Sequence, residues 1–403
     1  MTSKKLQSII DGDKEYLFQN YGDRLPVCFV RGEGSYLYDQ DGAQYIDFFS
    51  GIAVSSLGYG NNAFSKALHR QVETILHSSN WYYNKEQVEA ARLLSELSFP
   101  GKTLFVNSGT EASEAAIKLA RRYGQSISPD CYGIISFEGS FHGRTFGAMS
   151  ATAQEKIHKG FGPIVPGFTY LPYNDIKSFK KEIGSRRNVC AVITELVQGE
   201  GGIKIIDGSF IREVATICAK HKILLIIDEV QTGIGRTGEV FAYRHFDITP
   251  DIITMAKGLG GGVPVGAMHA RSDLSKYLEK GTHGTTFGGN HLASAAAVAV
   301  LKELKKPACM KKVKHSGAYI MDRMRALQKK TDIIQDVRGM GLHIGIELKK
   351  PGMDIVKRAL DEKLIINCTA EKVIRIMPPL TIGMPVIKQG LSILEKILLQ
   401  EVD

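Results

Sequence analysis

Lys257 ends the apolar run 252–256 and precedes glycines at positions 258 and 260–262. A lysine withdrawn from water becomes a nucleophile, because desolvation favours its neutral amine. Glycines beside it would let backbone or ligand approach closely. An isolated lysine before a loop is more often simply solvated. The segment alone therefore leaves a reactive amine and a surface amine as alternatives.

A carboxylate follows a second apolar run. Residues 223–227 predict a buried strand, so Asp228 would lie at its carboxyl end, where open α/β sheets bind their ligands. A desolvated carboxylate there needs a cation or several donors. The alternative is that Asp228 or Glu229 only orients the following loop.

The same region contains GIGRTG at 233–238, which matches the G-x-G-x-x-G pattern of nicotinamide and flavin sites. That pattern should open a helix directly after a strand. Here five residues separate the strand from the first glycine, and GEVFAYRHF follows where the helix should begin. A nicotinamide oxidoreductase is therefore the less favoured alternative.

A candidate anion site lies at Ser108, Gly109 and Thr110, between the strand-like LFV and the amphipathic SEAAIKLARRY. The first N–H groups of a helix have no intrahelical partner and lie in the positive field of the helix dipole. They can bind a phosphate or a carboxylate. Ordinary N-capping, with Glu111 or Glu114 closing the box, is the alternative.

Together these parts suit pyridoxal 5′-phosphate (PLP). Lys257 would form the Schiff base, and Asp228 would keep the pyridine nitrogen protonated. The segment 108–110 would hold the phosphate. Each alternative reading must treat this combination as coincidence.

Helical stretches at 64–76 and 86–97 alternate with β-branched runs at 103–106, 133–137, 189–195, 223–230 and 251–255. Such alternation predicts an α/β fold with a mostly parallel sheet covered by helices. An Asp-Gly pair within 35–51 indicates a hairpin. A helix is predicted at 291–306 and is stopped by Pro307, and the residues after it show the mixed helix and strand patterns of an α+β unit. We expect a large α/β domain at 58–306 and a small α+β domain built from 1–57 and 307–403.

Composition excludes several classes. The chain has 403 residues, 43% hydrophobic and 23% charged, which is ordinary for a soluble globular protein. Its net charge of +9 is scattered, without basic clusters interleaved with aromatics, so we expect no nucleic-acid partner. The start shows no leader peptide and no stretch is long enough to span a membrane. Six dispersed cysteines fit a reducing compartment, and no metal-ligand spacing occurs. We expect a cytoplasmic protein.

Seven motifs occur in the order found in one enzyme family: SNWYYN, FVNSGTEASEAAIKLAR, SFHGRTFGAMSAT, ITELVQGEGG, IIDEVQTGIGRTG, TMAKGLGGGVPVGA and HGTTFGGN. With them the chain resembles the class III (ω-amino acid) aminotransferases over nearly its whole length, and among these most closely the acetylornithine aminotransferases. The resemblance implies PLP-dependent transferase fold type I.

The resemblance also implies roles for further residues. Phe141 would stack on the cofactor ring. Gln231 would hydrogen-bond the phenolic oxygen side of the ring. Thr286 would reach the phosphate bound by a neighbouring subunit, which implies a homodimer with composite active sites.

Three charged residues would bind substrate. Arg144 would bind the carboxylate far from the reacting amine, and Arg375 the α-carboxylate of glutamate or 2-oxoglutarate. Glu200 would pair with Arg375 when an ω-amine is bound and release it for the dicarboxylate. Apart from the resemblance, both arginines would be read as surface residues.

The reaction implied is ping-pong transamination from N2-acetyl-L-ornithine to 2-oxoglutarate, giving N-acetylglutamate 5-semialdehyde and glutamate, a step of arginine biosynthesis. Alternative donors are succinylornithine, N-succinyl-diaminopimelate, ornithine and 4-aminobutyrate. Alternative classes of protein are an aminomutase of the same fold and a non-catalytic binding relative. The chain departs from the family at Tyr59, Asn62, Trp81, Leu196 and His291. Trp81 is expected in the core or, alternatively, at the substrate entrance.

Overall fold

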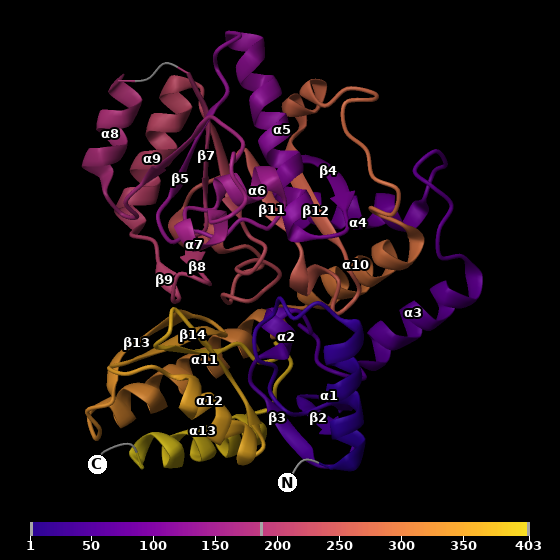
Figure 1. Ribbon diagram of the computed structural model, residues 1–403. Helices are drawn as coiled ribbons and strands as arrows, with labels where there is room; N and C mark the ends of the chain where they lie inside the picture. Colours follow the sequence, from indigo (N-terminus) through magenta and orange to yellow (C-terminus); the bar gives the residue numbers. More distant parts are fainter. Residues whose placement is uncertain (1–2, 186–187, 401–403) are drawn as a thin grey trace.

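The structure, a computed structural model, describes residues 3–185 and 188–400. Figure 1 shows two bodies: an upper one around a large sheet and a lower one in which both ends of the chain lie together. The upper body contains a seven-stranded sheet of order β4-β12-β11-β10-β7-β5-β6. Its strands are β4 (Gly101–Val106), β5 (Gly133–Phe137), β6 (Phe168–Leu171), β7 (Val189–Thr194), β10 (Leu224–Asp228), β11 (Ile252–Met255) and β12 (Gly266–Arg271).

This sheet confirms the expected α/β class. β6, β5, β7, β10 and β11 run parallel, whereas β12 pairs antiparallel with both β11 and β4. The sequence reading missed β6 and β12. Helices of this body are α3 (Asn62–Thr74), α4 (Lys85–Leu97), α5 (Gly109–Ile127), α6 (Phe146–Ala151), α7 (Glu155–His158), α8 (Ile176–Ser185), α9 (Gly208–His221) and α10 (His291–Leu304). Shorter elements are the 3-10 turns η1 (Ala242–Phe246), η2 (Lys257–Leu259) and η3 (Ser272–Tyr277) and the ribbon β8 (Val197–Gln198) with β9 (Lys204–Ile205).

Both faces of the central strands are buried, which explains their continuous apolar runs. Leu224 and Ile226 of β10 pack in the cluster that contains the apolar face of α5. Leu225 and Ile227, on the opposite face, pack with residues of α9. The two-residue period of the strand thus fixes β10 between helices and brings its carboxyl end to one edge of the sheet.

The lower body joins segments from both ends of the chain. β15 (Leu364–Ile365) pairs parallel with β3 (Gln44–Asp47), next to β2 (Tyr36–Asp39) and β1 (Phe29–Glu33). A second sheet has the order β13-β14-β17-β16. Its strands and the remaining helices are β13 (Ile334–Met340), β14 (His343–Leu348), β16 (Asn367–Thr369), β17 (Val373–Ile376), α1 (Lys4–Tyr16), α2 (Ser50–Ala53), α11 (Pro307–Gln328), α12 (Met353–Asp361) and α13 (Met384–Leu399).

The β2–β3 hairpin confirms the Asp-Gly signal at 41–42. Pro307 does not merely stop α10: it stands at the start of α11, where its fixed φ and missing N–H are compatible with a helix. The domain boundaries at 57/58 and 306/307 stay a prediction, although the β3–β15 pairing agrees with a unit built from both ends.

Candidate active site

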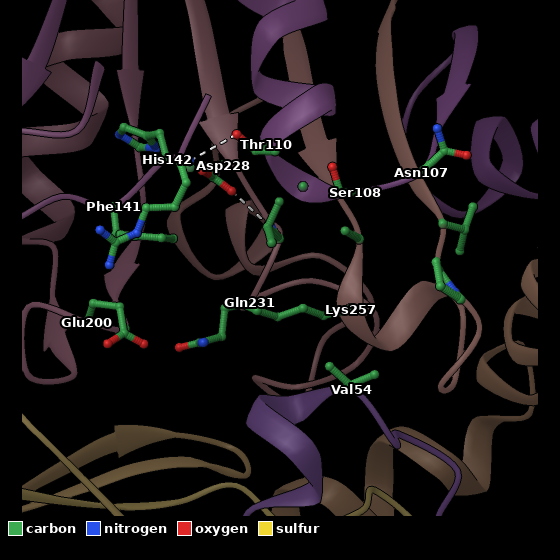
Figure 2. Close-up of a pocket in the computed structure, with 18 of the residues that line it drawn as sticks. Val54, Asn107, Ser108, Thr110, Phe141, His142, Glu200, Asp228, Gln231 and Lys257 are labelled. Atoms are coloured by element: carbon green, nitrogen blue, oxygen red, sulfur yellow. Dashed lines mark hydrogen bonds and ion pairs between the residues drawn. The ribbon is translucent and has the colours of Figure 1, made fainter. Parts of the chain in front are cut away.

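A cavity of about 420 Å³ lies at the carboxyl edge of the large sheet. Nine of the expected site residues line it, and ten of its residues are labelled in Figure 2. The nine are Ser108, Gly109, Thr110, Phe141, Arg144, Glu200, Asp228, Gln231 and Lys257. The fold therefore brings together residues that are up to about 150 positions apart in the sequence, because the strands that precede them end at the same edge of the sheet.

Lys257 follows β11 and is the first residue of η2. Its φ of 42° lies in the left-handed region, which is uncommon for a residue with a side chain and marks local strain. Burial lowers the pKa of its amine, against the opposing charges of Asp228 and Glu200. A larger share of neutral, nucleophilic amine is the consequence. The solvated-lysine alternative does not hold.

Asp228 ends β10 and is 4% exposed. Its Oδ2 accepts a hydrogen bond from Nδ1 of His142 at 2.7 Å, and its Oδ1 accepts one from the Val230 backbone N–H at 3.0 Å. The carboxylate is thus held from two sides, and Figure 2 shows His142 beside it. Asp228 does orient the following loop, and it also faces the cavity.

Two buried residues of the cavity were not singled out from the sequence: His142, which contacts Asp228, and Glu195. Glu195 follows β7, and its carboxylate accepts the backbone N–H groups of Phe141 at 2.9 Å and Gly199 at 3.3 Å. Burial raises the pKa of Glu195 to about 7, with Asp228 adding to the rise and His142 opposing it. Glu195 stands after a third parallel strand, so the rule that selected Asp228 could have found it.

Ser108 is the N-cap of α5, and its hydroxyl accepts the N–H of Glu111. The N–H groups of Gly109 and Thr110 have no acceptor within the helix, because the carbonyls four residues earlier lie outside it. A Cβ on Gly109 would come within 2.8 Å of Val230, so only glycine permits this close approach. The backbone here has the open N–H groups that an anion site needs, and phosphate binding at it stays a prediction.

The Thr110 hydroxyl makes two hydrogen bonds within the chain. It accepts the backbone N–H of Arg144 at 3.1 Å and of Thr145 at 3.2 Å. It thereby ties the start of α5 to the loop that carries Arg144. The guanidinium of Arg144 lies 5.5 Å from the centre of the Phe141 ring, at the exposed rim of the cavity.

Glu200 and Arg375 are in contact, with 2.6 Å between Oε1 and Nη1. Arg375 is 3% exposed and also donates from Nε to Asn367 Oδ1 at 2.9 Å, so it does not line the cavity itself. Burial alone would raise the pKa of Glu200, but the Arg375 guanidinium outweighs it and the pKa lies below its ordinary value. Arg375 is no surface arginine: Glu200 covers it.

Thr286 does not line this cavity. It lines a second cavity of about 870 Å³ together with Trp81, Asn80, Phe105 and Thr285. Trp81 is 92% exposed, so its expected place in the core is wrong. His291 Nε2 lies 2.9 Å from Ser78 Oγ in the same region, while Leu196 is fully buried.

A family model described as aminotransferase class III matches residues 17–398. The chain is a class III aminotransferase. Acetylornithine aminotransferase of Aquifex aeolicus is 48% identical over 384 residues, covering 95% of this chain and 100% of that protein. The acetylornithine aminotransferase of Caldanaerobacter subterraneus is 45% identical over 392 residues, covering 97% and 99%.

Solved structures agree. Ornithine aminotransferase of Toxoplasma gondii superimposes with a TM-score of 0.95 at 31% identity, covering 99% of this chain and 96% of that one. Acetylornithine aminotransferase of Elizabethkingia anophelis gives 0.89 at 31% identity, covering 99% and 100%. These enzymes share the fold type that the sequence predicted.

The aminotransferase is PLP-dependent, as its family is. The residues fit the cofactor: a buried amine, a carboxylate, an aromatic ring and an anion cradle line one cavity. GIGRTG does not open a helix, because the next helical turn is η1. In the part of the chain that the structure describes, no helix is long and apolar enough to cross a membrane.

Proposed function

We propose that this aminotransferase transfers the terminal amine of N2-acetyl-L-ornithine to 2-oxoglutarate, giving N-acetyl-L-glutamate 5-semialdehyde and glutamate in arginine biosynthesis. The observation that carries the proposal is the Glu200–Arg375 pair beside Lys257. The names of the relatives that cover nearly the whole chain support the donor.

The pair accounts for two unlike substrates at one site. With Glu200 on it, Arg375 offers no free charge to a donor whose reacting end carries only an amine. A dicarboxylate can displace Glu200, since Arg375 then gains a bidentate carboxylate in its place. Arg144, at the rim of the same cavity, would bind the carboxylate at the far end of the substrate.

PLP, when bound, supplies an electron sink that stabilises charge on the substrate carbon and stores the amino group. Lys257 Nζ would hold it covalently and then move a proton at the substrate carbon, for which its lowered pKa suits it. Asp228 would face the pyridine nitrogen and Phe141 the ring. The N–H groups of Gly109 and Thr110 would hold the phosphate.

Gln231 would donate its amide N–H to the phenolic oxygen of PLP. It lines the cavity and is 7% exposed, so its amide is held rather than solvated. His142 and Glu195, which also line the cavity, would support Asp228 and the Phe141 backbone respectively.

We also propose a homodimer in which Thr286 reaches the phosphate site of the second copy. Trp81, which lines the cavity that contains Thr286, is 92% exposed, and so to a large extent are its chain neighbours Tyr82 (69%) and Tyr83 (104%) and the Phe287 next to Thr286 (58%). An apolar face of this kind favours burial against another protein surface. A cytoplasmic location is part of the proposal.

The test is an absorption spectrum of the PLP-loaded protein after adding one donor without any keto acid. N2-acetylornithine should convert the visible cofactor band to the pyridoxamine band faster than succinylornithine, N-succinyl-diaminopimelate, ornithine or 4-aminobutyrate. A faster alternative donor would replace acetylornithine in the proposal. Turnover that needs no 2-oxoglutarate would indicate an aminomutase instead.

A further inference from the structure

A buried histidine contacts the Gln231 side chain from beyond the cavity. His343 is the first residue of β14, in the lower body, and is fully buried. Its Nε2 lies 3.0 Å from Oε1 of Gln231, which belongs to the loop after β10 in the upper body. This hydrogen bond therefore connects the C-terminal sheet to a residue at the cofactor cavity.

The direction of the bond fixes the Gln231 amide. An amide oxygen only accepts, so His343 Nε2 must carry the proton and donate it. The NH₂ group of Gln231 is then left for another acceptor. A Cβ on Gly199 would come within 1.9 Å of Gln231 Oε1, so the neighbouring backbone packs directly against the same oxygen. The oxygen end is enclosed; in Figure 2 the amide lies between Lys257 and Glu200.

The His343 imidazole is costly to bury at this position unless its hydrogen bond to Gln231 offsets the cost. Its Nδ1 is buried and has no hydrogen-bond partner among the residues that the structure describes. Burial lowers the pKa of His343 well below its ordinary value, and the charges of Arg236, Arg375 and Lys257 lower it further, so the ring is neutral. A leucine would fill such a position without an unsatisfied nitrogen. The contact with Gln231 is the feature that offsets this penalty.

We propose that His343 is a positioning residue that holds the Gln231 amide with its NH₂ toward the phenolic oxygen of PLP. This inference rests on the proposed role of Gln231 in the PLP-dependent reaction. Without His343 the amide could rotate and present its oxygen, which would repel an oxygen acceptor of the cofactor.

The test is a double-mutant cycle on PLP binding, with the variants His343→Leu, Gln231→Ala and the two combined. The readouts are the PLP dissociation constant and the wavelength of the visible cofactor band. Each single variant should weaken binding roughly three- to tenfold and shift the band in the same direction. The double variant should resemble Gln231→Ala alone, because His343 acts only through Gln231.

His343→Gln is the matched variant, since its amide can return a donor to Gln231; it should recover most of the wild-type affinity and band position. Thermal unfolding of the cofactor-free proteins separates packing from positioning. If His343→Leu changes stability alone, or if its effect on PLP affinity adds fully to that of Gln231→Ala, the inference is wrong. If the wild type itself binds no PLP, the proposed function fails first and the inference fails with it.

Discussion

The Lys257 cavity and the face around Trp81 differ in how far their side chains are paired or buried within the chain. In the first, buried charges have partners within the chain: Asp228 with His142, and Glu200 with Arg375. In the second, Trp81 is almost wholly exposed and lines a cavity with Thr286, and Tyr83, two residues further along the chain, is also exposed. In the first region these charges are paired within the chain, whereas the second has the composition of a surface that packs against another surface.

The largest expected effect comes from the amine of the first region. Lys257→Ala should abolish the visible band of bound PLP and reduce transamination on the order of 10³-fold or more, because it removes both the covalent attachment and the proton carrier. The measurement is the absorption spectrum with steady-state turnover. Lys280→Ala, an exposed lysine outside the cavity, is the control and should behave as wild type. A retained visible band in the first variant would refute the assignment of Lys257.

The buried carboxyl of the first region should make stability depend on pH. Its folded pKa of about 7 lies above the ordinary 4.5, so Glu195 stabilises the fold fully below pH 4.5 and loses this contribution as pH rises to 7. The loss is about 3 kcal/mol in the free energy of unfolding. As the pH rises from 5 to 8, wild type should therefore lose free energy of unfolding that Glu195→Gln does not lose.

Urea unfolding of the cofactor-free protein at the two pH values measures this difference. Trp81→Ala, in the exposed region, is the control and should leave the pH dependence unchanged. The same pH dependence in Glu195→Gln as in wild type would show that Glu195 does not titrate in this range.

The sequence predicted the first region better than the second, for a physical reason. Asp228 and Lys257 each follow an apolar strand, and adjacent parallel strands end at one edge: Asp228 of β10 lies opposite Thr254 of β11. Local patterns thus placed them together. The anion cradle was equally local, because it needs only a helix start after a strand.

Contacts between segments far apart in the sequence could not be predicted from local residue patterns. The Glu200–Arg375 contact came from the resemblance and depends on how β17 packs beside the loop after β8. His142, His343 and Asn367 are single polar residues with no periodic signal. Trp81 failed differently: a large apolar side chain is usually buried, and nothing local distinguishes a core from a docking face.

Within the first region, the two members of the ion pair should have opposite effects on the half-reactions. Arg375→Ala should slow the reaction with 2-oxoglutarate on the order of 10²-fold, since charge-assisted hydrogen bonds to the α-carboxylate are lost. Glu200→Gln leaves Arg375 uncovered and should instead slow the reaction with the ω-amine donor. Single-turnover rates for each substrate separate the two, and equal losses in both half-reactions for either variant would contradict the switch.

The smallest effect belongs to the second region, and it decides whether that region serves another copy. Thr286→Ala should weaken PLP binding about tenfold, the loss of one phosphate hydrogen bond, although Thr286 lies outside the cavity of its own chain. Thr282→Ala, whose hydroxyl contacts Glu279 of its own chain, is the control.

Mixed assemblies of Lys257→Ala and Thr286→Ala chains sharpen the comparison. If sites are composite, each mixed pair contains one site with a native lysine and a native threonine, and that site should bind PLP with wild-type affinity. If Thr286 served its own chain, the only lysine-bearing site would also carry the threonine defect, and the affinity would stay about tenfold weaker. Recovery on mixing thus requires that the exposed region completes the site of a second copy.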